Sequence, residues 1–398
     1  MREQVEGSRA VARMVAMCRP QVIAAYPISP QTHVVEGLSD LVRSGDLASC
    51  EYLTVESEFA AMSACIGASA VGARAYTASS SQGLLFMAEA VFNASGLGFP
   101  IVMTVANRAL GAPINIWNDH SDSMALRDAA WIQLYAADVQ EAVDLHAQAF
   151  VLAERVSLPV MVCMDGFVLT HAVEEVDLPE QAEVDAFVPA FVPRQVLDPA
   201  NPVTIGAMVG PEAFTEVRYL LQRRMDAALT AVPEVADGFE RRFGRRAGGL
   251  VRGYRTEDAD TVLVTLGSVA GAAAEVVDEL RSEGVAAGAL TITCFRPWPT
   301  AAVREALAGA RRVVVLERAF SVGRGSIVGQ DVRDSLHDLP VPVVEVVGGL
   351  GGRPVRRADI KGLIESVNAD LLPPGRLHFL DLDHALLSTA GAAEGAVR

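Results

Sequence analysis

The stretch 52-YLTVESEFAAMSACIGASAVGARAYTAS-79 places a long run of small and apolar residues between two short apolar segments. The segments YLTV and ARAYTAS have the length of strands, and the run over 56–72 has the length of a helix. Two short strands joined by a helix of more than ten residues indicate a βαβ unit, in which the strands are parallel. The stretch therefore predicts an α/β protein.

The same alternation of strands and helices extends on both sides of this stretch. The expected strands are VIAAYPI (22–28), IVMTVA (101–106) and LPVMVCMDGF (158–167). The expected helices are 5–18, 33–43, 83–95, 139–155 and roughly 211–230. Residues 174–203 are acidic and contain several prolines, which favours an irregular excursion over the surface. The first part of the chain thus predicts one parallel sheet with helices packed beside it.

A charged, glycine-rich segment divides the chain, whose 398 residues are too many for one ordinary core. We interpret this segment, 233–260, as a linker between a first domain over 1–232 and a smaller α/β domain over 261–398. In the second domain the alternation restarts. Its expected strands are 261–267, 286–294, 311–317 and 341–347, and its expected helices are 269–283, 300–308, 324–336 and 357–367.

Charge and composition exclude several classes of function. The net charge of −16 argues against nucleic acid as the main partner, because binding phosphate groups requires a surplus of Lys and Arg. No apolar run reaches about 18 residues, and acidic residues interrupt the N-terminus, so we expect neither a membrane span nor a signal peptide. The five cysteines are scattered without a C-x-x-C pair. This pattern indicates buried thiols in a reducing cytoplasm and places any iron–sulfur cluster on another chain.

Polar side chains follow four of the expected strands of the first domain, in the segments YPISPQT, TVESEF, SSSQG and ANR. Six residues stand out at these positions: Ser29, Glu58, Ser81, Gln82, Asn107 and Arg108. Parallel strands carry their carboxyl ends at one edge of a sheet, where such sheets bind ligands. We therefore expect these side chains to gather at that edge.

Each of these features also has a purely structural interpretation. The prolines around Ser29 can simply end a strand, and Glu58 suits the N-terminus of a helix as a carboxylate. However, the helix after Glu58 is apolar nearly all round and therefore buried, so its carboxylate needs a partner such as a cofactor nitrogen. The SSSQG turn suits either a phosphate or a helix cap. Arg108 suits either a carboxylate ligand, held by two parallel hydrogen bonds, or a structural ion pair.

The segment WNDHSD (117–122) contributes three further candidate site residues, Asn118, Asp119 and His120. Asp119 and His120 together with Asp122 have the side chains of a metal site. Their spacing matches no recognised metal-binding pattern. The segment therefore favours a hydrogen-bonded loop, and we expect no metal site on this chain.

The succession of YPISPQT, VESEFAAMSACIGASAVGARAYTASSSQGLLFM and VMTVANRALGAPINIWNDHSDSM resembles the α subunit of the 2-oxoacid:ferredoxin oxidoreductase family, with pyruvate:ferredoxin oxidoreductase as the best match. The resemblance is dense in the first domain and covers the second in outline. It implies a pyrimidine-type thiamine diphosphate-binding fold, followed by a smaller domain similar to the C-terminal domain of transketolase.

The resemblance also implies roles for individual residues. Glu58 matches the glutamate that hydrogen-bonds N1′ of the thiamine aminopyrimidine and so promotes deprotonation of the thiazolium. Arg108 matches the arginine that holds the substrate carboxylate. Ser29 matches a threonine whose hydroxyl touches the 2-oxoacid, so it keeps the hydroxyl and lacks a methyl group. Ser81 and Gln82 are the remaining candidates for contacts with the cofactor.

The resemblance further implies partner chains. A β subunit would carry the diphosphate and Mg²⁺ motif, and γ and δ subunits would carry the iron–sulfur clusters that pass electrons to ferredoxin. The active site would lie between α and β, and the complex would convert pyruvate, or a similar 2-oxoacid, and coenzyme A to the acyl-CoA and CO₂ in the cytoplasm. Two alternatives stay open: a subunit of a non-oxidative thiamine-dependent decarboxylase or transferase, and a noncatalytic scaffold subunit.

Overall fold

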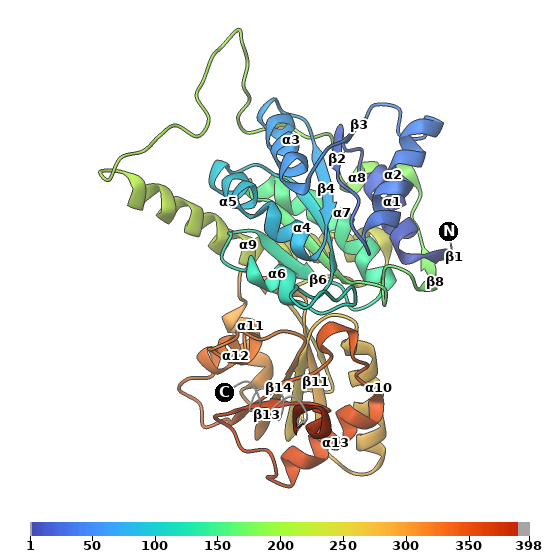
Figure 1. The fold of residues 1–398 in the computed structure, drawn as a ribbon, viewed down its shortest axis with the longest axis vertical. Coiled ribbons are helices and arrows are strands. Elements are labelled where there is room, and N and C mark those ends of the chain that lie inside the picture. Colours follow the sequence, from blue (N-terminus) through green and yellow to red (C-terminus); the bar gives the residue numbers. More distant parts are fainter. Residues whose placement is uncertain (1, 389–398) are drawn as a thin grey trace.

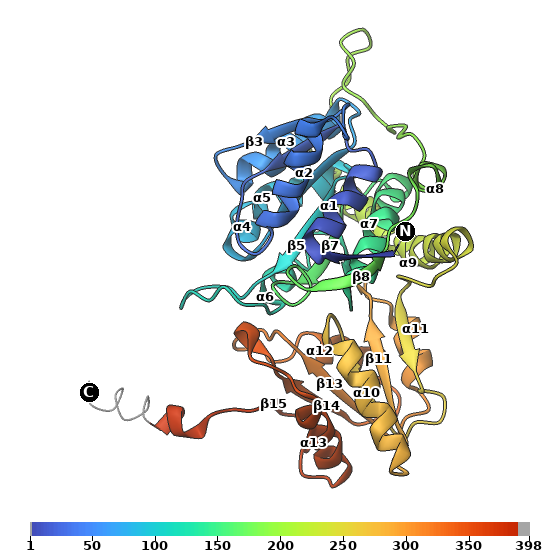
Figure 2. The ribbon, with the colours of Figure 1, turned by 90° about the vertical axis from the view of Figure 1, so that its right-hand side faces the viewer.

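Two β-sheets lie one beyond the other along the long axis of the molecule (Figure 1). The computed structural model describes residues 2–388. The N-terminal half of the chain builds one sheet with helices on both faces, and the C-terminal part builds a smaller unit of the same type (Figure 2). The alternation of strands and helices in the sequence thus produces the α/β architecture that it predicted.

The first sheet has seven strands, and all neighbours are parallel except one edge pair. In spatial order the strands are β12 (Cys294–Arg296), β6 (Ile132–Tyr135), β7 (Val160–Asp165), β5 (Val102–Asn107), β4 (Ala75–Ser79), β2 (Val22–Ala25) and β3 (Glu51–Thr54). The central strands β4, β5 and β7 are buried along their whole length. Burial on both faces explains why their sequences are continuous apolar runs and not alternating patterns.

Helices cover both faces of this sheet, and each face has its own core. One face packs against α1 (Gly7–Met17), α2 (Thr32–Ser44), α7 (Val139–Val156) and α9 (Phe214–Phe243). The opposite face packs against α3 (Glu58–Ala70), α4 (Ser81–Phe86) and α5 (Ala88–Leu97). Two shorter helices, α6 (Ser121–Ala125) and α8 (Gln181–Phe187), and the ribbon of β1 (Arg2–Glu6) with β8 (Val173–Asp177) complete the unit.

The second sheet has six strands, all parallel except the edge strand β9. The spatial order is β15 (Leu377–Phe379), β14 (Val343–Val347), β13 (Arg312–Glu317), β10 (Thr261–Thr265), β11 (Ala287–Ile292) and β9 (Val251–Tyr254). α10 (Val269–Ser282) and α13 (Arg357–Asn368) cover one face, and α11 (Thr300–Leu307) and α12 (Val328–Ser335) cover the other. A short 3₁₀ helix, η1 (Leu350–Gly352), follows β14.

The two units share a core and exchange a strand. The apolar cluster under α3 and α5 continues into α12 and the face of the second sheet beneath it. After β11 the chain crosses to the first sheet, where β12 pairs antiparallel with β6. A continuous core predicts that the two units move little relative to each other.

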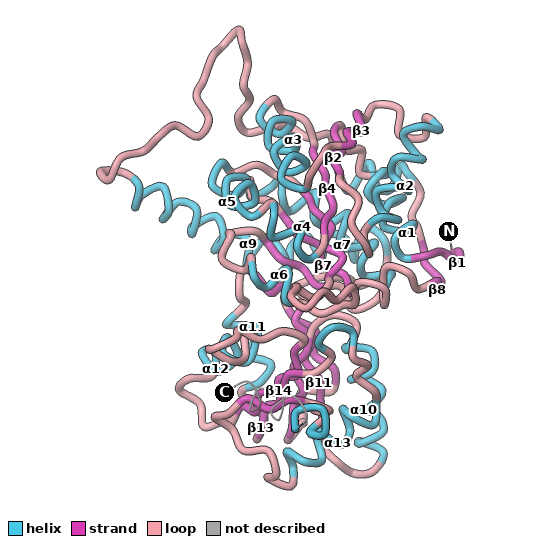
Figure 3. The backbone as a smooth tube through the Cα atoms, viewed as in Figure 1, coloured by secondary structure: helices cyan, strands magenta, loops and turns pink. Residues whose placement is uncertain are grey.

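The chain between 174 and 260 is more regular than its composition predicts. Part of the expected excursion forms β8 and α8, and the irregular segment runs from 188 to 213, projecting as a long loop between α8 and α9 (Figure 3). Residues 233–243, expected in the linker, are the last turns of α9, and 251–254 form β9. The helix passes through Pro233 because its buried face continues beyond it to Phe239, which packs against Phe187.

Other differences concern short elements. The helix expected over 83–95 is divided at Met87 into α4 and α5. The sequence interpretation missed the strands β1, β6, β12 and β15, which have three to five residues each. Such strands are too short for a periodic pattern to reveal. Among residues 2–388, no helix has both the length and the apolar composition needed to cross a bilayer.

Candidate active site

The predicted side chains follow successive strands at one edge of the first sheet. Ser29 lies in the loop after β2, and Glu58 is the first residue of α3, shortly after β3. Ser81 opens α4 two residues after the end of β4, and Arg108 directly follows Asn107, the last residue of β5. The strand ends thus hold the candidate residues at the carboxyl edge, where open parallel sheets bind ligands.

Glu58 is a largely buried residue whose carboxylate has no partner in the part of the chain that the structure describes. Only 6% of the residue is exposed, and its side chain makes no hydrogen bond or ion pair with any of residues 2–388. Ser57 caps the helix by accepting a hydrogen bond from the backbone N–H of Ala60 at 3.2 Å, so the carboxylate of Glu58 is not needed as the cap. Burying an unpaired carboxylate is costly. The position therefore fits a donor group supplied from outside the chain.

Gly83 leaves the space that this carboxylate fills. A Cβ atom on Gly83 would lie 2.3 Å from Oε1 of Glu58, so any larger side chain at this position would push the Glu58 carboxylate out of its place. Gly83 belongs to the SSSQG segment, so this glycine brings the turn after β4 against the start of α3. The sequence interpretation singled out the polar residues of that segment and missed its glycine.

We expect Gly83→Ala to lower kcat by about 10²-fold, because the added methyl group displaces the Glu58 carboxylate by more than an ångström. The melting temperature should change little, since alanine is compatible with the helix that contains position 83. The matched control is Gly67→Ala in α3, where a Cβ atom meets nothing within 4 Å. Steady-state kinetics and thermal melting of the assembled enzyme check this prediction, and equal kcat values for the two variants would refute it.

Arg108 is a buried cation without a carboxylate partner among residues 2–388. Only 7% of the residue is exposed. Nη1 donates a hydrogen bond to the carbonyl oxygen of Ser29 at 2.9 Å, and Nε donates to that of Asn115 at 3.1 Å. The guanidinium thus joins two loops while its charge stays uncompensated. The alternative of a structural ion pair has no support in these contacts.

The loop that contains Ser29 is held through its backbone and through Gln31. Gln31 is fully buried, and its side-chain amide donates to the carbonyl oxygen of Tyr26 at 2.8 Å. The Ser29 hydroxyl is exposed and has no hydrogen-bond partner within 2–388, whereas the Ser29 carbonyl binds Arg108. The hydroxyl is therefore available to a ligand beside the guanidinium.

Asp122 organises the edge of the sheet, a role that sequence reasoning missed. It is fully buried and accepts hydrogen bonds from the backbone N–H of Ser81 at 2.9 Å and of Arg108 at 3.0 Å. Its other oxygen accepts from the side chain of Asn107 at 2.8 Å. Burial raises the pKa of Asp122 to about 6, against the opposing effect of these hydrogen bonds. The Asn107 side chain thus donates a hydrogen bond to Asp122 and is fully buried, so it binds within the fold and does not face a ligand.

Ser81 uses its hydroxyl within its own turn. Its Oγ donates a hydrogen bond to the carbonyl oxygen of Ala109 at 2.6 Å, and its backbone has a positive φ of 50°. The neighbouring Gln82 is exposed. A phosphate therefore competes with an existing internal bond at Ser81. The Gln82 side chain accepts a second hydrogen bond from Ser81 Oγ at 2.5 Å and would have to release it to turn toward a ligand.

The WNDHSD segment forms the hydrogen-bonded loop that its spacing favoured, and it joins the two units. Asp119 accepts a hydrogen bond from the backbone N–H of Gly351 at 3.1 Å. His120 Nε2 lies 2.7 Å from Oδ1 of Asp165. Asn118, which precedes Asp119 in the sequence, is also buried. Within 2–388, Asp119, His120 and Asp122 do not form a cluster with metal-ligand distances.

Asp165, at the end of β7, is the centre of the contact between the units. Besides His120, it binds Arg318 Nη1 at 2.9 Å and the backbone N–H of Ser268 at 2.8 Å. Burial alone would raise the pKa of Asp165, but the charges of Arg318 and His120 hold it well below the usual value of 3.8. The carboxylate is therefore ionised throughout the neutral and mildly acidic range.

We expect Asp165→Asn to lower the free energy of unfolding by about 3 kcal/mol at pH 7, because it leaves the Arg318 cation buried without a partner. A carboxyl whose pKa is depressed by folding stabilises the protein above its unfolded-state pKa, and this stability is lost as the pH falls. The difference between wild type and variant should therefore shrink below about pH 4. Urea unfolding at several pH values measures it, with Asp237→Asn, an exposed position on α9, as the control. A difference that stays constant down to pH 2 would contradict the assignment.

Comparison with known families identifies both parts of the chain. A model described as the thiamine diphosphate-binding domain of pyruvate flavodoxin/ferredoxin oxidoreductase matches residues 13–237. A model of core domain II of pyruvate:ferredoxin oxidoreductase matches residues 259–360. The chain belongs to the pyruvate:ferredoxin oxidoreductase family. The resemblance stated from the sequence motifs is thereby confirmed.

Curated relatives in the pyruvate:ferredoxin oxidoreductase family match nearly the whole chain. The pyruvate synthase subunit PorA of Methanosarcina barkeri is 48% identical over 366 residues, which cover 91% of each chain. PorA of Methanocaldococcus jannaschii is 46% identical, over 91% of this chain and 94% of its own. The ketoisovalerate oxidoreductase subunit VorA of Pyrococcus horikoshii is 38% identical, over 92% and 94%.

Two solved structures share the fold at low sequence identity. A 2-oxoglutarate:ferredoxin oxidoreductase from Magnetococcus marinus superposes with a TM-score of 0.73 at 18% identity, over 92% of this chain and 65% of that chain. A split-gene transketolase superposes with a TM-score of 0.54 at 15% identity, over 92% of this chain and 98% of its own. The predicted fold, a thiamine diphosphate-binding domain followed by a smaller α/β domain, is confirmed.

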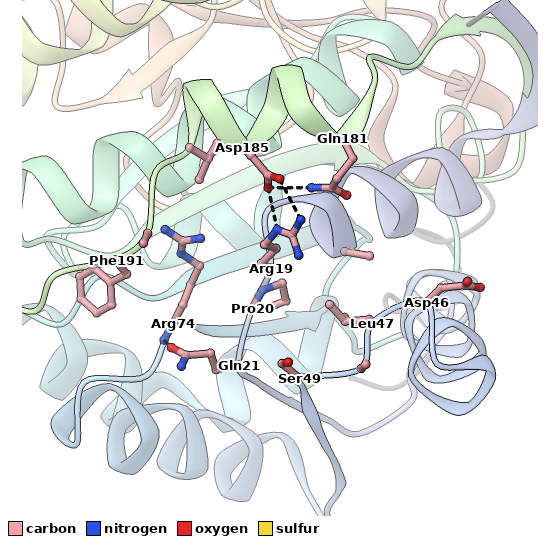
Figure 4. A pocket seen from close by; sticks show the side chains of 14 residues that line it. Arg19, Pro20, Gln21, Asp46, Leu47, Ser49, Arg74, Gln181, Asp185 and Phe191 are labelled. Atoms are coloured by element: carbon pink, nitrogen blue, oxygen red, sulfur yellow. Dashed lines mark hydrogen bonds and ion pairs between the residues drawn. The ribbon is translucent and has the colours of Figure 1, made fainter.

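One sizeable cavity of this pyruvate:ferredoxin oxidoreductase chain has neither Glu58 nor Arg108 in its lining. It has a volume of about 600 Å³ and is lined by residues before β2 and around α8 (Figure 4). Its two arginines are paired with carboxylates: Arg19 with Asp185 at 2.6 Å and Arg74 with Glu154 at 2.5 Å. The lining of this cavity therefore offers no unpaired cation with which to bind the carboxylate of a 2-oxoacid.

Exposed apolar side chains lie on the segments that carry the candidate site residues. Such residues lie on the loops and helices next to Glu58 and Arg108: Tyr26, Leu53, Phe59, Phe86, Ile114, Ile116 and Trp117. Large apolar side chains gathered around a functional site are typical of a surface that another protein covers. Such a surface fits the α–β interface that the resemblance implies.

Proposed function

We propose that this chain is the α subunit of a pyruvate:ferredoxin oxidoreductase and that it supplies Glu58, Arg108 and Ser29 to an active site completed by a partner chain. The observation that carries this proposal is the pair of uncompensated buried charges at one sheet edge. Glu58 lacks a donor and Arg108 lacks a carboxylate among residues 2–388. Thiamine diphosphate and a 2-oxoacid would provide both.

The environment of Glu58 fits the pyrimidine of thiamine diphosphate. The carboxylate is buried, has no internal partner and has a fixed place beside Gly83, so it can accept a hydrogen bond from a ring nitrogen without first breaking another contact. When bound, thiamine diphosphate supplies the nucleophilic carbon and the electron sink for loss of CO₂ from a 2-oxoacid. Glu58 would accept a hydrogen bond from the protonated pyrimidine nitrogen of that cofactor and so stabilise the proton there.

Arg108 and Ser29 would hold the substrate. A guanidinium has five N–H donors, and two of those of Arg108 are used by Ser29 and Asn115. The remaining donors can bind a carboxylate in two parallel hydrogen bonds. The exposed Ser29 hydroxyl lies in the same loop as the carbonyl that fixes the guanidinium, so it can contact the oxygen of the 2-oxo group. Relatives named pyruvate synthase, at 40–48% identity, favour pyruvate as that substrate.

Partner chains would supply the remaining chemistry. All five cysteines of the chain are buried and free, and burial raises the pKa of Cys65 and Cys294 to about 12, so these thiols stay protonated and are poor cluster ligands. A β subunit would bind the diphosphate through Mg²⁺. γ and δ subunits would carry iron–sulfur clusters to ferredoxin, and coenzyme A would accept the acyl group.

Co-expression with the neighbouring subunit genes tests the proposal. The purified complex should contain iron and acid-labile sulfide and should reduce a viologen dye only when both a 2-oxoacid and coenzyme A are present. A panel of pyruvate, 2-oxobutyrate, 2-oxoisovalerate and 2-oxoglutarate identifies the substrate. Decarboxylation without dye reduction would show that the enzyme is the non-oxidative decarboxylase or transferase. Full activity of the complex without this chain would show that the chain is a noncatalytic scaffold subunit.

Ser29→Thr should narrow the substrate range. The added methyl group occupies space beside Arg108, so we expect kcat/KM for 2-oxobutyrate to fall about 10-fold relative to pyruvate, in line with the effect of one methylene in a pocket. The hydroxyl is retained, so turnover of pyruvate itself should change little. Steady-state kinetics with both acids measures the ratio, with Ser49→Thr at an exposed position as the control. An unchanged ratio would remove Ser29 from the substrate pocket.

A further inference from the structure

Three side chains with metal-ligating groups meet near the N-terminal end of α2, shortly after the loop that contains Ser29. Glu6 ends β1, His33 is the second residue of α2, and His171 lies in the turn that follows β7. Each offers one ligand atom, and these atoms all lie within 4.8 Å of one another. All three residues are partly exposed, so an ion from solution can reach them. Among residues 2–388, no other group of three such side chains comes this close.

We propose that Glu6, His33 and His171 form a binding site for one Zn²⁺ ion. Two imidazole nitrogens and one carboxylate oxygen, with a fourth position left to water, are a common ligand set for zinc. Ligands at about 2.0–2.1 Å from a tetrahedral zinc lie roughly 3.3 Å apart. His33 Nδ1 and Glu6 Oε1 are 2.6 Å apart, so small side-chain rotations produce the required spacing.

The surroundings of the histidines support this site. Nδ1 of His171 lies 2.7 Å from Oγ1 of Thr170, a contact that fixes the ring, as the outer partners of metal-binding histidines do. The His33 and His171 rings lie 4.7 Å apart between centroids, tilted by 38°. Nitrogen and oxygen ligands without a thiolate favour Zn²⁺ over the soft Cu⁺ ion.

The position of the ion links it to the candidate active site. His33 lies four residues after Ser29, and the turn with His171 begins at Gly166, where a Cβ atom would lie 2.5 Å from Pro30 Cγ. A row of ring contacts leads from His171 through Phe167 to Trp117, near the loop that Arg108 holds. Zinc would therefore tie the Ser29 loop to the turn after β7 and restrict its movement.

Zinc binding to the tag-free, chelator-treated full chain tests the proposal. Isothermal titration should show one Zn²⁺ per chain, and His33→Ala and His171→Ala should each weaken binding by at least about 100-fold. The control His337→Ala removes an exposed histidine outside the cluster and should bind like wild type. Co²⁺ should give the visible bands of a tetrahedral nitrogen and oxygen site without a thiolate charge-transfer band.

Three results would overturn the proposal: no stoichiometric binding, equal affinity in wild type and in both histidine variants, or a thiolate band with Co²⁺. If the alanine variants do not fold, the zinc affinity of Glu6→Gln is the test. Its amide can keep the contact with His33 but is a weaker zinc ligand, so this variant should bind zinc more weakly than wild type. Retention of full affinity in a folded Glu6→Gln, His171→Gln double variant would equally exclude the site. Because these measurements need neither substrate nor partner chains, their outcome is independent of the proposed function.

Discussion

Glu58→Gln is expected to lower kcat of the assembled enzyme by about 10²–10⁴-fold, the range that proton transfer by a placed side chain contributes. Glutamine has the size of glutamate but no negative charge, so it cannot stabilise the protonated pyrimidine. The buried carboxylate has no partner within residues 2–388, so its neutralisation should leave the stability of the free chain equal or slightly increased. A loss of activity without a loss of stability is the expected signature.

The control for this variant lies two residues away. Glu56 is exposed in the same segment, and Glu56→Gln removes the same charge from the same loop. It should keep wild-type kcat. Stopped-flow measurement of CO₂ release and thermal melting of both variants provide the comparison. Full activity of Glu58→Gln in the complex would remove thiamine chemistry from this residue.

Arg108→Leu is expected to raise KM for the 2-oxoacid and to lower kcat/KM by roughly 10²-fold, because hydrogen bonds to a charged group contribute about 1.5–3 kcal/mol each. Arg108→Lys should lie between wild type and leucine, since lysine keeps the charge but cannot form two parallel bonds. Both variants also lose the contact with the Ser29 carbonyl. Part of the effect will therefore come from a less ordered loop.

The two contributions of Arg108 can be separated. Loss of the substrate contact raises KM only for the 2-oxoacid, whereas a disordered loop also lowers the melting temperature of the chain. Arg311→Leu, at an exposed arginine of the second domain, controls for the loss of a positive charge. An unchanged KM in Arg108→Leu would exclude the residue from substrate binding.

The sequence correctly predicted which residues lie at the carboxyl edge of the first sheet, because parallel strands all end at the same edge. Once β2, β3, β4 and β5 are recognised as parallel, the residues that follow them must share an edge, whatever the lengths of the helices between them. The sequence alone could thus place Glu58 and Arg108 at the same edge of the sheet, without any information on tertiary contacts. Glu58 is buried as expected, but the expectation that its whole helix is buried was wrong, because Phe59, Ser63 and Gly67 of α3 are exposed in this chain.

Long-range contacts could not be predicted in this way. Asp122 lies in a short helix after an irregular loop, and nothing in its neighbourhood shows that it accepts hydrogen bonds from two other strand ends. The same holds for Asp165, whose partners Ser268 and Arg318 are more than 100 residues distant. The importance of Gly83 comes from its close approach to the Glu58 side chain. This is a tertiary contact, so nothing in the sequence around Gly83 reveals it.

The course of the chain between the domains was mispredicted for a related reason. Pro233 and the arginines after it favour the end of a helix, but the buried face of α9 continues to Phe239. Tertiary packing there outweighs local preference. The strand β12 likewise has only three residues and is defined by its pairing with β6 of the other sheet.

The most direct test of the site is a structure of the assembled complex with thiamine diphosphate bound. We expect a carboxylate oxygen of Glu58 to lie within hydrogen-bond distance, about 2.6–3.2 Å, of pyrimidine N1′. With a 2-oxoacid also bound, Arg108 should face its carboxylate. A different acid at N1′, or cofactor bound away from the edge formed by β2, β4 and β5, would contradict the account.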